Sequence, residues 1–338
     1  MKKRRGLKIV CLIMAVPLAM LLVINLIPPK RNVENNPFVL QEDQPLMIAA
    51  HRGGGMNYPE NTMMAFREAV RSTGVDILES DLYLTADGHL VFNHDAYIDR
   101  TCNVGGDLSM EENEARYAVG ENRHYIYDLT LEELRQYNFG YYFADDDGNY
   151  PYRDVENFAD AGLQITTAEE LFAEFYDSHP DLLFIVEIKD GGDRGKEACR
   201  VFWEILQRYP AYQDQIVVGT FHDEIEDELQ ANYPQLLRGA PTGTAAKFIL
   251  TQYLRVNLFD NSDFACLQIP VEYDLGVTIP LDKKTLIRRA HRRNIAVQYW
   301  TINDPGEMRQ LIDLGCDCIM TDDPILLRQV LEETESAK

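Results

Sequence analysis

Residues 46–53 read LMIAAHRG, a short apolar run that ends abruptly in a histidine, an arginine and a glycine. A second run, ILESDL at residues 77–82, places Glu79 and Asp81 at its polar end. Runs of this length and apolar continuity are typical of strands buried on both faces, as in parallel sheets. Because parallel strands end at one edge of their sheet, we expect the polar residues of both runs to meet there.

The same unit recurs along the chain, and stretches with the apolar spacing of a helix follow most of the runs. Strands that alternate with helices over nearly 300 residues predict an α/β fold of parallel βα units, a (β/α)8 TIM barrel or a doubly wound sheet. Nine candidate strands are one too many for a closed barrel of eight. The extra strand is either 90–92, which is placed like the second arm of a hairpin, or 236–240. The candidates are 46–50, 77–82, 90–92, 182–188, 216–221, 236–240, 264–269, 295–300 and 317–320.

The alternation of strands and helices stops between residues 97 and 161, where Tyr, Asn and acidic residues are frequent. A structureless loop of that length is uncommon in a compact domain. We therefore predict an insertion subdomain at 97–161, beside the mouth of a barrel domain that covers 45–335.

The N-terminus carries a targeting signal. Residues 9–27 form an almost unbroken apolar run, which as a helix spans about 28 Å, close to the hydrocarbon thickness of a bilayer. Basic residues dominate 1–8, so the positive-inside rule predicts a cytoplasmic N-terminus, a single transmembrane helix and an extracellular barrel domain at the cell membrane. The alternative is a secreted protein whose signal is cleaved. Residues 28–44 are polar and rich in Pro and Asn, which is typical of a linker.

The net charge of −23 is unevenly distributed. Residues 1–31 hold seven basic groups and no acidic one, which leaves 25 basic against 55 acidic groups and a net charge of −30 in the remainder. Such a body repels nucleic acid, so we expect no nucleic-acid partner. A single phosphate ester can still bind through a local metal ion or arginine.

Three carboxylates fall at the ends of predicted strands. Glu79 and Asp81 are two residues apart, so in a strand they point to the same face, and Glu187 ends another run. Converging carboxylates repel each other unless a cation or proton lies between them. Three carboxylates without a cysteine predict a site for one hard divalent ion, Ca²⁺ or Mg²⁺.

His51 and His94 are the candidate acid–base pair, because both end predicted strands and imidazole titrates near neutral pH. Arg52 offers a fork of donors suited to phosphate oxygens. Lys189, two residues after Glu187, adds positive charge to the same face.

An ordered series of motifs resembles the glycerophosphodiester phosphodiesterases over roughly residues 47–331. By this resemblance the fold is a TIM barrel, Glu79, Asp81 and Glu187 bind the metal, and His51 and His94 are general base and acid. Arg52 and Lys189 would hold the phosphate, Trp300 would form part of the pocket wall, and Glu60 and Asn61 would support the loop after the first strand. The motifs are His51-Arg52-Gly53, Tyr58-Pro59-Glu60-Asn61-Thr62, Glu79-x-Asp81, Thr85-x-Asp87-Gly88, His94-Asp95, Glu187-Ile188-Lys189, Trp300-Thr301-Ile302-Asn303 and Ile319-Met320-Thr321-Asp322-Asp323-Pro324.

The expected function is metal-dependent hydrolysis of a small glycerophosphodiester to glycerol phosphate and an alcohol. Alternatives are a lysophospholipase D or sphingomyelinase D-like enzyme, a teichoic-acid-degrading phosphodiesterase, and a non-catalytic surface binding module. The alcohol head group, the choice between Ca²⁺ and Mg²⁺, direct hydrolysis against a cyclic phosphate intermediate, and the oligomeric state stay open.

Overall fold

The computed structural model describes residues 15, 19, 23–42, 44–120, 122–256, 258, 260–274 and 276–336. The predicted cytoplasmic residues 1–8 and most of the predicted transmembrane segment 9–27 lie outside the described residues. The helices within the described ranges all fall short of the length and apolar character that a bilayer crossing requires.

Eight parallel strands form a nearly closed barrel, which confirms the predicted α/β barrel fold. The main-chain hydrogen bonds follow the order β6-β5-β4-β2-β1-β11-β10-β7, and a parallel bridge between Gly239 and Cys266 joins β6 to β7. The strands are β1 (Met47–Ala50), β2 (Ile77–Leu84), β4 (Leu183–Ile188), β5 (Ile216–Gly219), β6 (Leu237–Arg238), β7 (Cys266–Ile269), β10 (Ala296–Tyr299) and β11 (Cys318–Thr321).

The surplus strand is β3 (Leu90–Phe92), which pairs antiparallel with the far end of β2. The run 236–240 instead belongs to the barrel as β6. A separate hairpin of β8 (Glu272–Asp274) and β9 (Thr278–Pro280) follows β7. The hairpin reading of 90–92 is therefore the correct one of the two alternatives.

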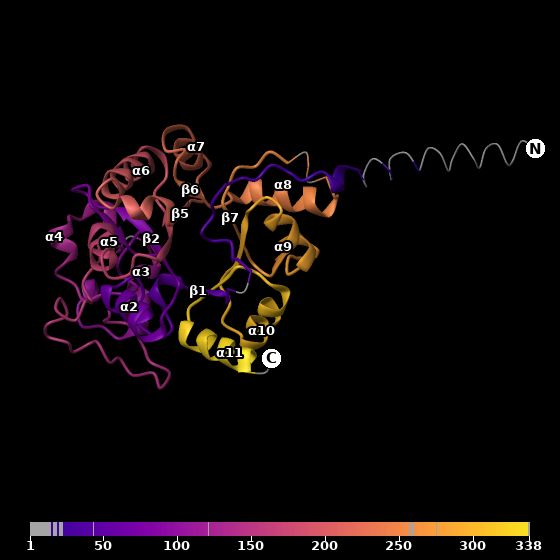
Figure 1. Cartoon of the computed structure of the whole chain (residues 1–338). Helices are drawn as coiled ribbons and strands as arrows, with labels where there is room; N and C mark the ends of the chain where they lie inside the picture. Colours follow the sequence, from indigo (N-terminus) through magenta and orange to yellow (C-terminus); the bar gives the residue numbers. More distant parts are fainter. Residues whose placement is uncertain are drawn as a thin grey trace, which may run out of the picture.

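Helices surround the barrel, with α5, α6 and α7 on one side and α8, α9, α10 and α11 on the other (Figure 1). Their apolar faces pack on the outward-facing residues of the strands, since successive side chains of a strand point to opposite faces. The helices are α2 (Met63–Glu68), α3 (Met110–Ala118), α4 (Leu131–Leu134), α5 (Ala168–Phe175), α6 (Gly192–Leu206), α7 (Asp223–Asn232), α8 (Thr242–Tyr253), α9 (Lys284–His291), α10 (Pro305–Leu314) and α11 (Pro324–Ser336).

The segment predicted to be a linker packs across the amino ends of the strands. Phe38 is fully buried and joins the cluster of side chains inside the barrel, which includes Met47 and Ile185. The Asn36 side-chain amide donates to the carbonyl of Ala265 at 2.8 Å, just before β7. Residues within 28–44 thus close one end of the barrel.

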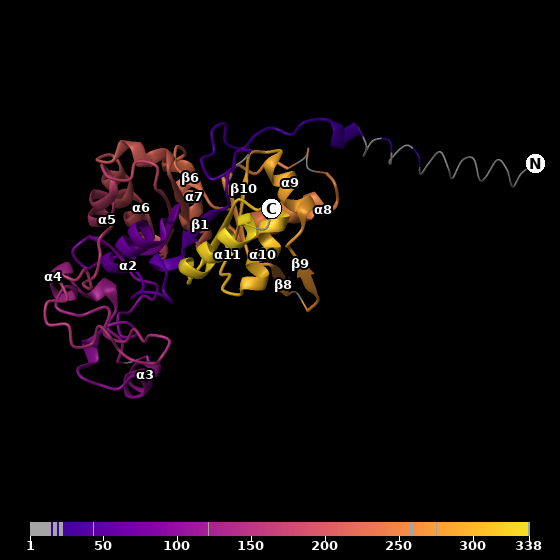
Figure 2. The same cartoon turned by 60° about the horizontal axis from the view of Figure 1, so that its bottom comes forward.

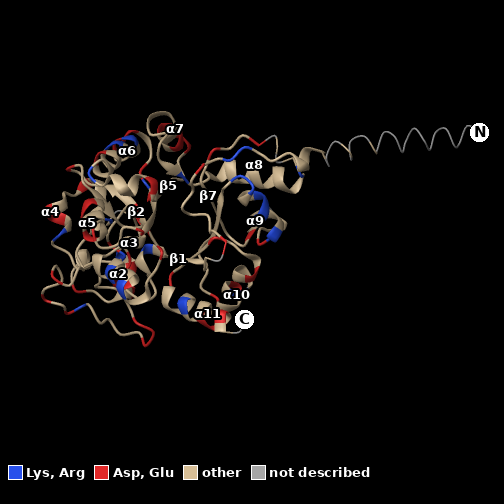
Figure 3. Ribbon diagram, in the orientation of Figure 1, with Lys and Arg blue, Asp and Glu red and all other residues tan. Residues whose placement is uncertain are grey.

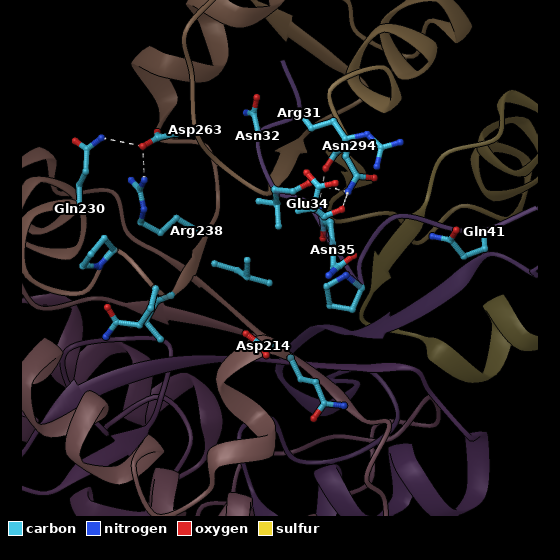
Figure 4. Close-up of a pocket in the computed structure, with 18 residues that line it drawn as sticks. Arg31, Asn32, Glu34, Asn35, Gln41, Asp214, Gln230, Arg238, Asp263 and Asn294 are labelled. Carbon is cyan, nitrogen blue, oxygen red and sulfur yellow. Dashed lines mark hydrogen bonds and ion pairs between the residues drawn. The ribbon is translucent and has the colours of Figure 1, made fainter. Parts of the chain in front are cut away.

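A polar groove of 1010 Å³ lies beside this closing segment, between it and the loops that precede β5 and β6 (Figure 4). Arg238 in the groove is already paired with Glu226 and, at 2.8 Å, with Asp263. The groove opens at the amino ends of the strands, where barrel enzymes do not place their chemistry.

The predicted insertion, residues 97–161, contains α3 and α4 and lies beside the barrel (Figure 2). It has a small buried cluster of its own, which includes Ile98, Ile126 and Leu134. Because β3 contributes Val91 to the same cluster, the insertion is fixed to the strand that follows β2.

Candidate active site

The His51-Arg52-Gly53 sequence forms a tight turn directly after β1. Arg52 and Gly53 both have positive φ angles, 54° and 81°, so the chain reverses sharply there. A Cβ atom on Gly53 would lie 2.9 Å from the Cβ of Ala65 in α2, a distance that packed side chains do not adopt. The glycine therefore lets the turn approach α2 and holds His51 and Arg52 over the barrel mouth.

The predicted carboxylates meet at this mouth. Asp81 of β2 lies in register with Glu187 of β4, and Glu79 precedes it on the same face of β2. The Glu79 carboxylate accepts a hydrogen bond from the Arg52 backbone N–H at 2.9 Å. Lys189 places its ammonium 3.4 Å from Asp81 Oδ1 and 3.1 Å from Glu187 Oε1. The sequence-predicted acidic trio and both predicted cations thus converge on one site.

The donor chemistry of this cluster fits a hard divalent cation. Burial and the neighbouring Asp81 charge raise the pKa of Glu79 to about 7, and burial raises the pKa of Glu187. The cluster therefore carries more negative charge than its surroundings stabilise, and an oxygen-seeking cation would relieve it. The Asn61 side-chain oxygen, next to Asp81, is also buried without a hydrogen-bond partner.

Lys189 makes the arrangement less like a metal site, because its ammonium occupies the position between Asp81 and Glu187. Within the described ranges, no three His, Cys, Asp or Glu side chains are arranged as a set that could hold a metal. The carboxylates are therefore the right kind of ligand for a divalent ion, but in this arrangement the described side chains do not form a complete set of metal ligands.

His51 is held by a carboxylate that the sequence analysis did not assign. Its Nδ1 lies 2.5 Å from Asp322 Oδ1, and Asn303 donates to the other oxygen of Asp322 at 2.8 Å. Burial acts to lower the pKa of His51, but the Glu79 and Asp322 carboxylates outweigh it and raise the pKa above its usual value. With Nδ1 bonded to Asp322, Nε2 faces the site, 3.9 Å from Glu79. Asp322 follows β11 directly, and this position at the end of a predicted strand is the sequence feature that could have marked it as a site residue.

His94 belongs to a second network. Its Nδ1 lies 3.0 Å from Asp95 Oδ1, and Asp95 accepts from Arg100 Nε at 2.5 Å. Arg100 also binds Glu60 through two hydrogen bonds of 2.5 and 3.0 Å, and Glu60 lies 3.4 Å from Arg52. Glu60 therefore connects the loop after β1 to the network that contains His94.

Arg100 and Asp95 were missed as site residues. Arg100 lies in the 97–161 stretch, which carries no motif of its own, so only the folded chain reveals its contact with Glu60. The two Arg100 hydrogen bonds with Glu60 hold the pKa of that carboxyl below its usual range despite burial. The insertion therefore supplies a residue that fixes the site.

The remaining predicted residues, Asn61 and Trp300, lie in the segments that follow β1 and β10. Asn61 has a positive φ of 58°, donates its backbone N–H to the Arg52 carbonyl at 2.8 Å and lies 3.5 Å from Asp81. Trp300 follows β10, and its ring centre lies 6.5 Å from that of Phe221, which is 64% exposed. The two rings lie beside each other at the end of the barrel where β5 and β10 finish.

Converging carboxylates, two cations and His51 lie at the carboxyl ends of the barrel strands, where barrel enzymes place their catalytic groups, and this set suits an anionic substrate. Comparison with known families gives the class of substrate. Residues 51–326 match the glycerophosphoryl diester phosphodiesterase family, and the chain belongs to this family of phosphoric diester hydrolases, enzymes that hydrolyse glycerophosphodiesters.

Individual relatives agree with this assignment. A glycerophosphodiester phosphodiesterase of Caldanaerobacter subterraneus is 27% identical over 278 residues, which cover 82% of this chain and 94% of the relative. A lysophospholipase D of Mus musculus is 23% identical over 86% of this chain and 83% of its own. The solved structure of an Oleispira antarctica phosphodiesterase with the product sn-glycerol-3-phosphate matches the fold with a TM-score of 0.59 at 20% identity, over 87% of this chain and 98% of that one.

Proposed function

We propose that this enzyme hydrolyses glycerophosphodiesters with one divalent ion, Ca²⁺ or Mg²⁺, and with His51 and His94 as its acid–base pair. The observation that carries the proposal is the position of His51, held between the Asp322 and Glu79 carboxylates at the rim of the acidic cluster. A proton acceptor and a cation-binding cluster next to each other are the two parts that diester hydrolysis requires.

Glu79, Asp81 and Glu187 would hold the ion. When bound, such an ion supplies positive charge close to the phosphoryl oxygens. Arg52 and Lys189 add charge from the protein itself, and the Nε of Arg52 is a buried donor without a hydrogen-bond acceptor, which suits it to a phosphate oxygen. Together these cations favour the extra negative charge that develops on the phosphoryl group.

The two histidines move protons at defined atoms. Because Asp322 accepts from Nδ1, His51 keeps Nε2 toward the site, where it takes the proton of the attacking hydroxyl. His94, oriented by Asp95 and protonated at the start, donates its proton to the oxygen of the departing alcohol, while His51 keeps the proton taken from the nucleophile. The attacking group is water or the neighbouring glycerol hydroxyl, which would form a cyclic phosphate first.

The test is turnover of glycerophosphocholine by the purified full chain, before and after treatment with a chelator. We expect activity to be lost with chelator and restored by added Ca²⁺ or Mg²⁺, with glycerol phosphate and choline as products. Full activity in excess chelator would contradict the metal part of the proposal, and no release of choline with any metal would contradict the substrate.

A lysophospholipase D activity is the second candidate, and two observations favour it. The Mus musculus relative carries that activity in its name. The exposed Phe221 ring beside Trp300 offers an apolar surface on which an acyl chain could rest. Parallel assays on lysophosphatidylcholine and glycerophosphocholine distinguish the two substrates, because the better substrate has the larger kcat/KM.

We also propose that residues 9–27 anchor the enzyme in the cell membrane with the catalytic domain outside. Support comes from the apolar run, from the basic residues before it and from the exposed Val23, Leu26 and Ile27 at its end. Protease added to intact cells should degrade the barrel domain while membranes retain the N-terminus. Recovery of the intact domain in the culture medium would favour the cleaved signal instead.

A further inference from the structure

The side of the barrel formed by α8 and α9 has a charge opposite to that of the molecule as a whole. Residues 283–293 contain six Lys and Arg and no Asp or Glu. The entire chain carries a net charge of −23. Figure 3 shows Lys and Arg residues in blue along α9, next to α8 and near the point where the N-terminal segment leaves the barrel. A positive surface therefore lies on an acidic protein.

Most of these cations have no acidic partner. Within the part of the chain that the structure describes, Lys284, Arg288, Arg292 and the neighbouring Arg255 are exposed and form no ion pair with a carboxylate. Some cations elsewhere on the surface are paired with carboxylates, as Arg200 is with two glutamates. Unpaired charges of one sign raise the local potential and favour an anionic partner from outside the chain.

Large apolar side chains are exposed next to the basic residues. Leu250, Tyr253 and Leu254, at the carboxyl end of α8, are 57%, 43% and 58% exposed. Val23 and Leu26, at the end of the predicted transmembrane segment, are 57% and 81% exposed. Clustered apolar side chains bordered by cations are typical of surfaces that enter the interfacial region of a membrane.

Hydrogen bonds hold the end of the N-terminal segment directly on this surface. The Asn25 side chain donates to the Arg255 carbonyl at 2.8 Å and accepts from Arg289 at 2.9 Å. Arg292 donates to the Ile27 carbonyl at 3.1 Å. A bilayer that contained residues 9–27 would therefore begin within a few residues of the basic and apolar side chains.

We propose that this α8–α9 surface docks on an anionic lipid bilayer, with its leucines in the headgroup region and its cations against lipid phosphates. The surface is defined by Leu250, Tyr253, Leu254, Arg255, Arg288 and Arg292.

Charge complementarity and the position of the N-terminal segment both favour the bilayer over other occupants. A soluble polyanion would satisfy the cations but would leave the leucines in water. Docking would hold the barrel by its α8–α9 side, so that the enzyme lies on the membrane instead of moving freely around a single anchor.

The experiment compares hydrogen exchange of the full chain in nanodiscs of neutral phosphatidylcholine and in nanodiscs that also contain phosphatidylglycerol. Anionic lipid should slow exchange in peptides from 247–256 and 284–292, and 1 M salt should reverse the effect because the Debye length falls to about 3 Å. Equal exchange in both lipids would overturn the proposal.

Two matched variants test the role of the cations. Each cation near an anionic surface favours docking by about fivefold, so K284Q/R288Q/R292Q should reduce the lipid-dependent protection by more than about tenfold. K196Q/R200Q/R208Q removes the same charge from α6 and the turn that follows it, on the other side of the barrel, and should leave the protection unchanged. Equal losses in the two variants would contradict a defined docking surface.

A third variant tests the bilayer itself. L250S/L254S keeps every charge and should weaken protection by the anionic nanodisc. Unchanged protection in this variant, or equal protection by soluble poly(glycerol phosphate), would identify an anionic polymer as the partner and overturn the proposal. Protection that depends on protein concentration and not on lipid would identify a second copy of the chain, with the same consequence. All three variants should retain wild-type turnover of glycerophosphocholine.

Discussion

The two ends of the barrel are built from different kinds of residue. At the carboxyl ends of the strands, Glu79 and Asp81 are buried beside cations, and burial raises the pKa of Glu79 to about 7. At the amino ends, Phe38 fills the barrel and the Asn36 amide satisfies backbone carbonyls. The carboxyl end therefore holds buried charges, which cost free energy of folding. The amino end buries apolar side chains, which contributes free energy of folding. Activity should therefore depend on one end and stability on the other.

The largest expected effect is at the carboxyl end. His51→Ala should lower kcat by about 10²- to 10⁴-fold, because the group that accepts the proton is lost. Since the side chain lies at the rim and not in the core, the free energy of unfolding should change little. Steady-state assays and urea unfolding of the same preparation check both statements, and near wild-type turnover by a folded variant would contradict the role of His51.

The amino end should give the reverse result. Phe38→Ala removes a fully buried ring and should lower the free energy of unfolding by about 3–5 kcal/mol, with kcat unchanged at temperatures where the variant stays folded. Val119→Ala, at a side chain that is 69% exposed, is the control and should be nearly neutral. Urea unfolding measures both. A loss below 1 kcal/mol for Phe38→Ala would mean that the segment 28–44 does not contribute to the fold.

A smaller effect is expected at Asp322, which acts through His51. Asp322→Asn should lower kcat by about 10²-fold with little change in KM, because an amide no longer fixes the proton on Nδ1. Asp322→Glu should restore part of the activity. A variant with wild-type kcat, or one whose only change is in KM, would contradict a positioning role.

The smallest effect is expected on the outer helices, away from both ends. Glu174 accepts two hydrogen bonds of 2.8 Å from Arg67, and these lower the pKa of its carboxyl below the ordinary value. The pair therefore stabilises the fold above the unfolded-state pKa, and this contribution disappears as the pH falls through the lowered folded-state pKa. Because solvent reaches the pair, Glu174→Gln should cost no more than about 1 kcal/mol at pH 7.

Unfolding curves of wild type and Glu174→Gln between pH 3 and pH 7 provide the measurement. The difference between the two proteins should shrink as the carboxylate of the wild type becomes protonated. A difference that persists at pH 3 would show that the glutamine perturbs packing instead of removing a charge.

Much of the fold and site follows from local patterns. The apolar runs with polar ends predict the strands and the edge where His51, Glu79 and Glu187 meet, because parallel strands share a direction. The same patterns could not decide between 90–92 and 236–240, since a short apolar run has the same appearance in a hairpin and in a barrel.

Contacts between distant parts of the chain account for what the sequence did not reveal. Asp322 lies 271 residues after His51, and Arg100 reaches Glu60 from the 97–161 stretch. Residues 28–44 have the composition of a linker, yet Asn36 finds its hydrogen-bond acceptors more than 200 residues later, at Ala265 and Asn294. Pairings of this kind depend on the folded backbone and leave no local periodicity.

The central claim is that Glu79, Asp81 and Glu187 bind one divalent ion, although Lys189 lies between two of them. Calorimetric titration of Ca²⁺ and Mg²⁺ into the chelator-treated full chain and into Glu187→Gln tests it directly. The account predicts one ion bound per wild-type chain and at least about tenfold weaker binding by the variant. Equal affinity in the two proteins, or no binding of either ion to the wild type, would contradict it.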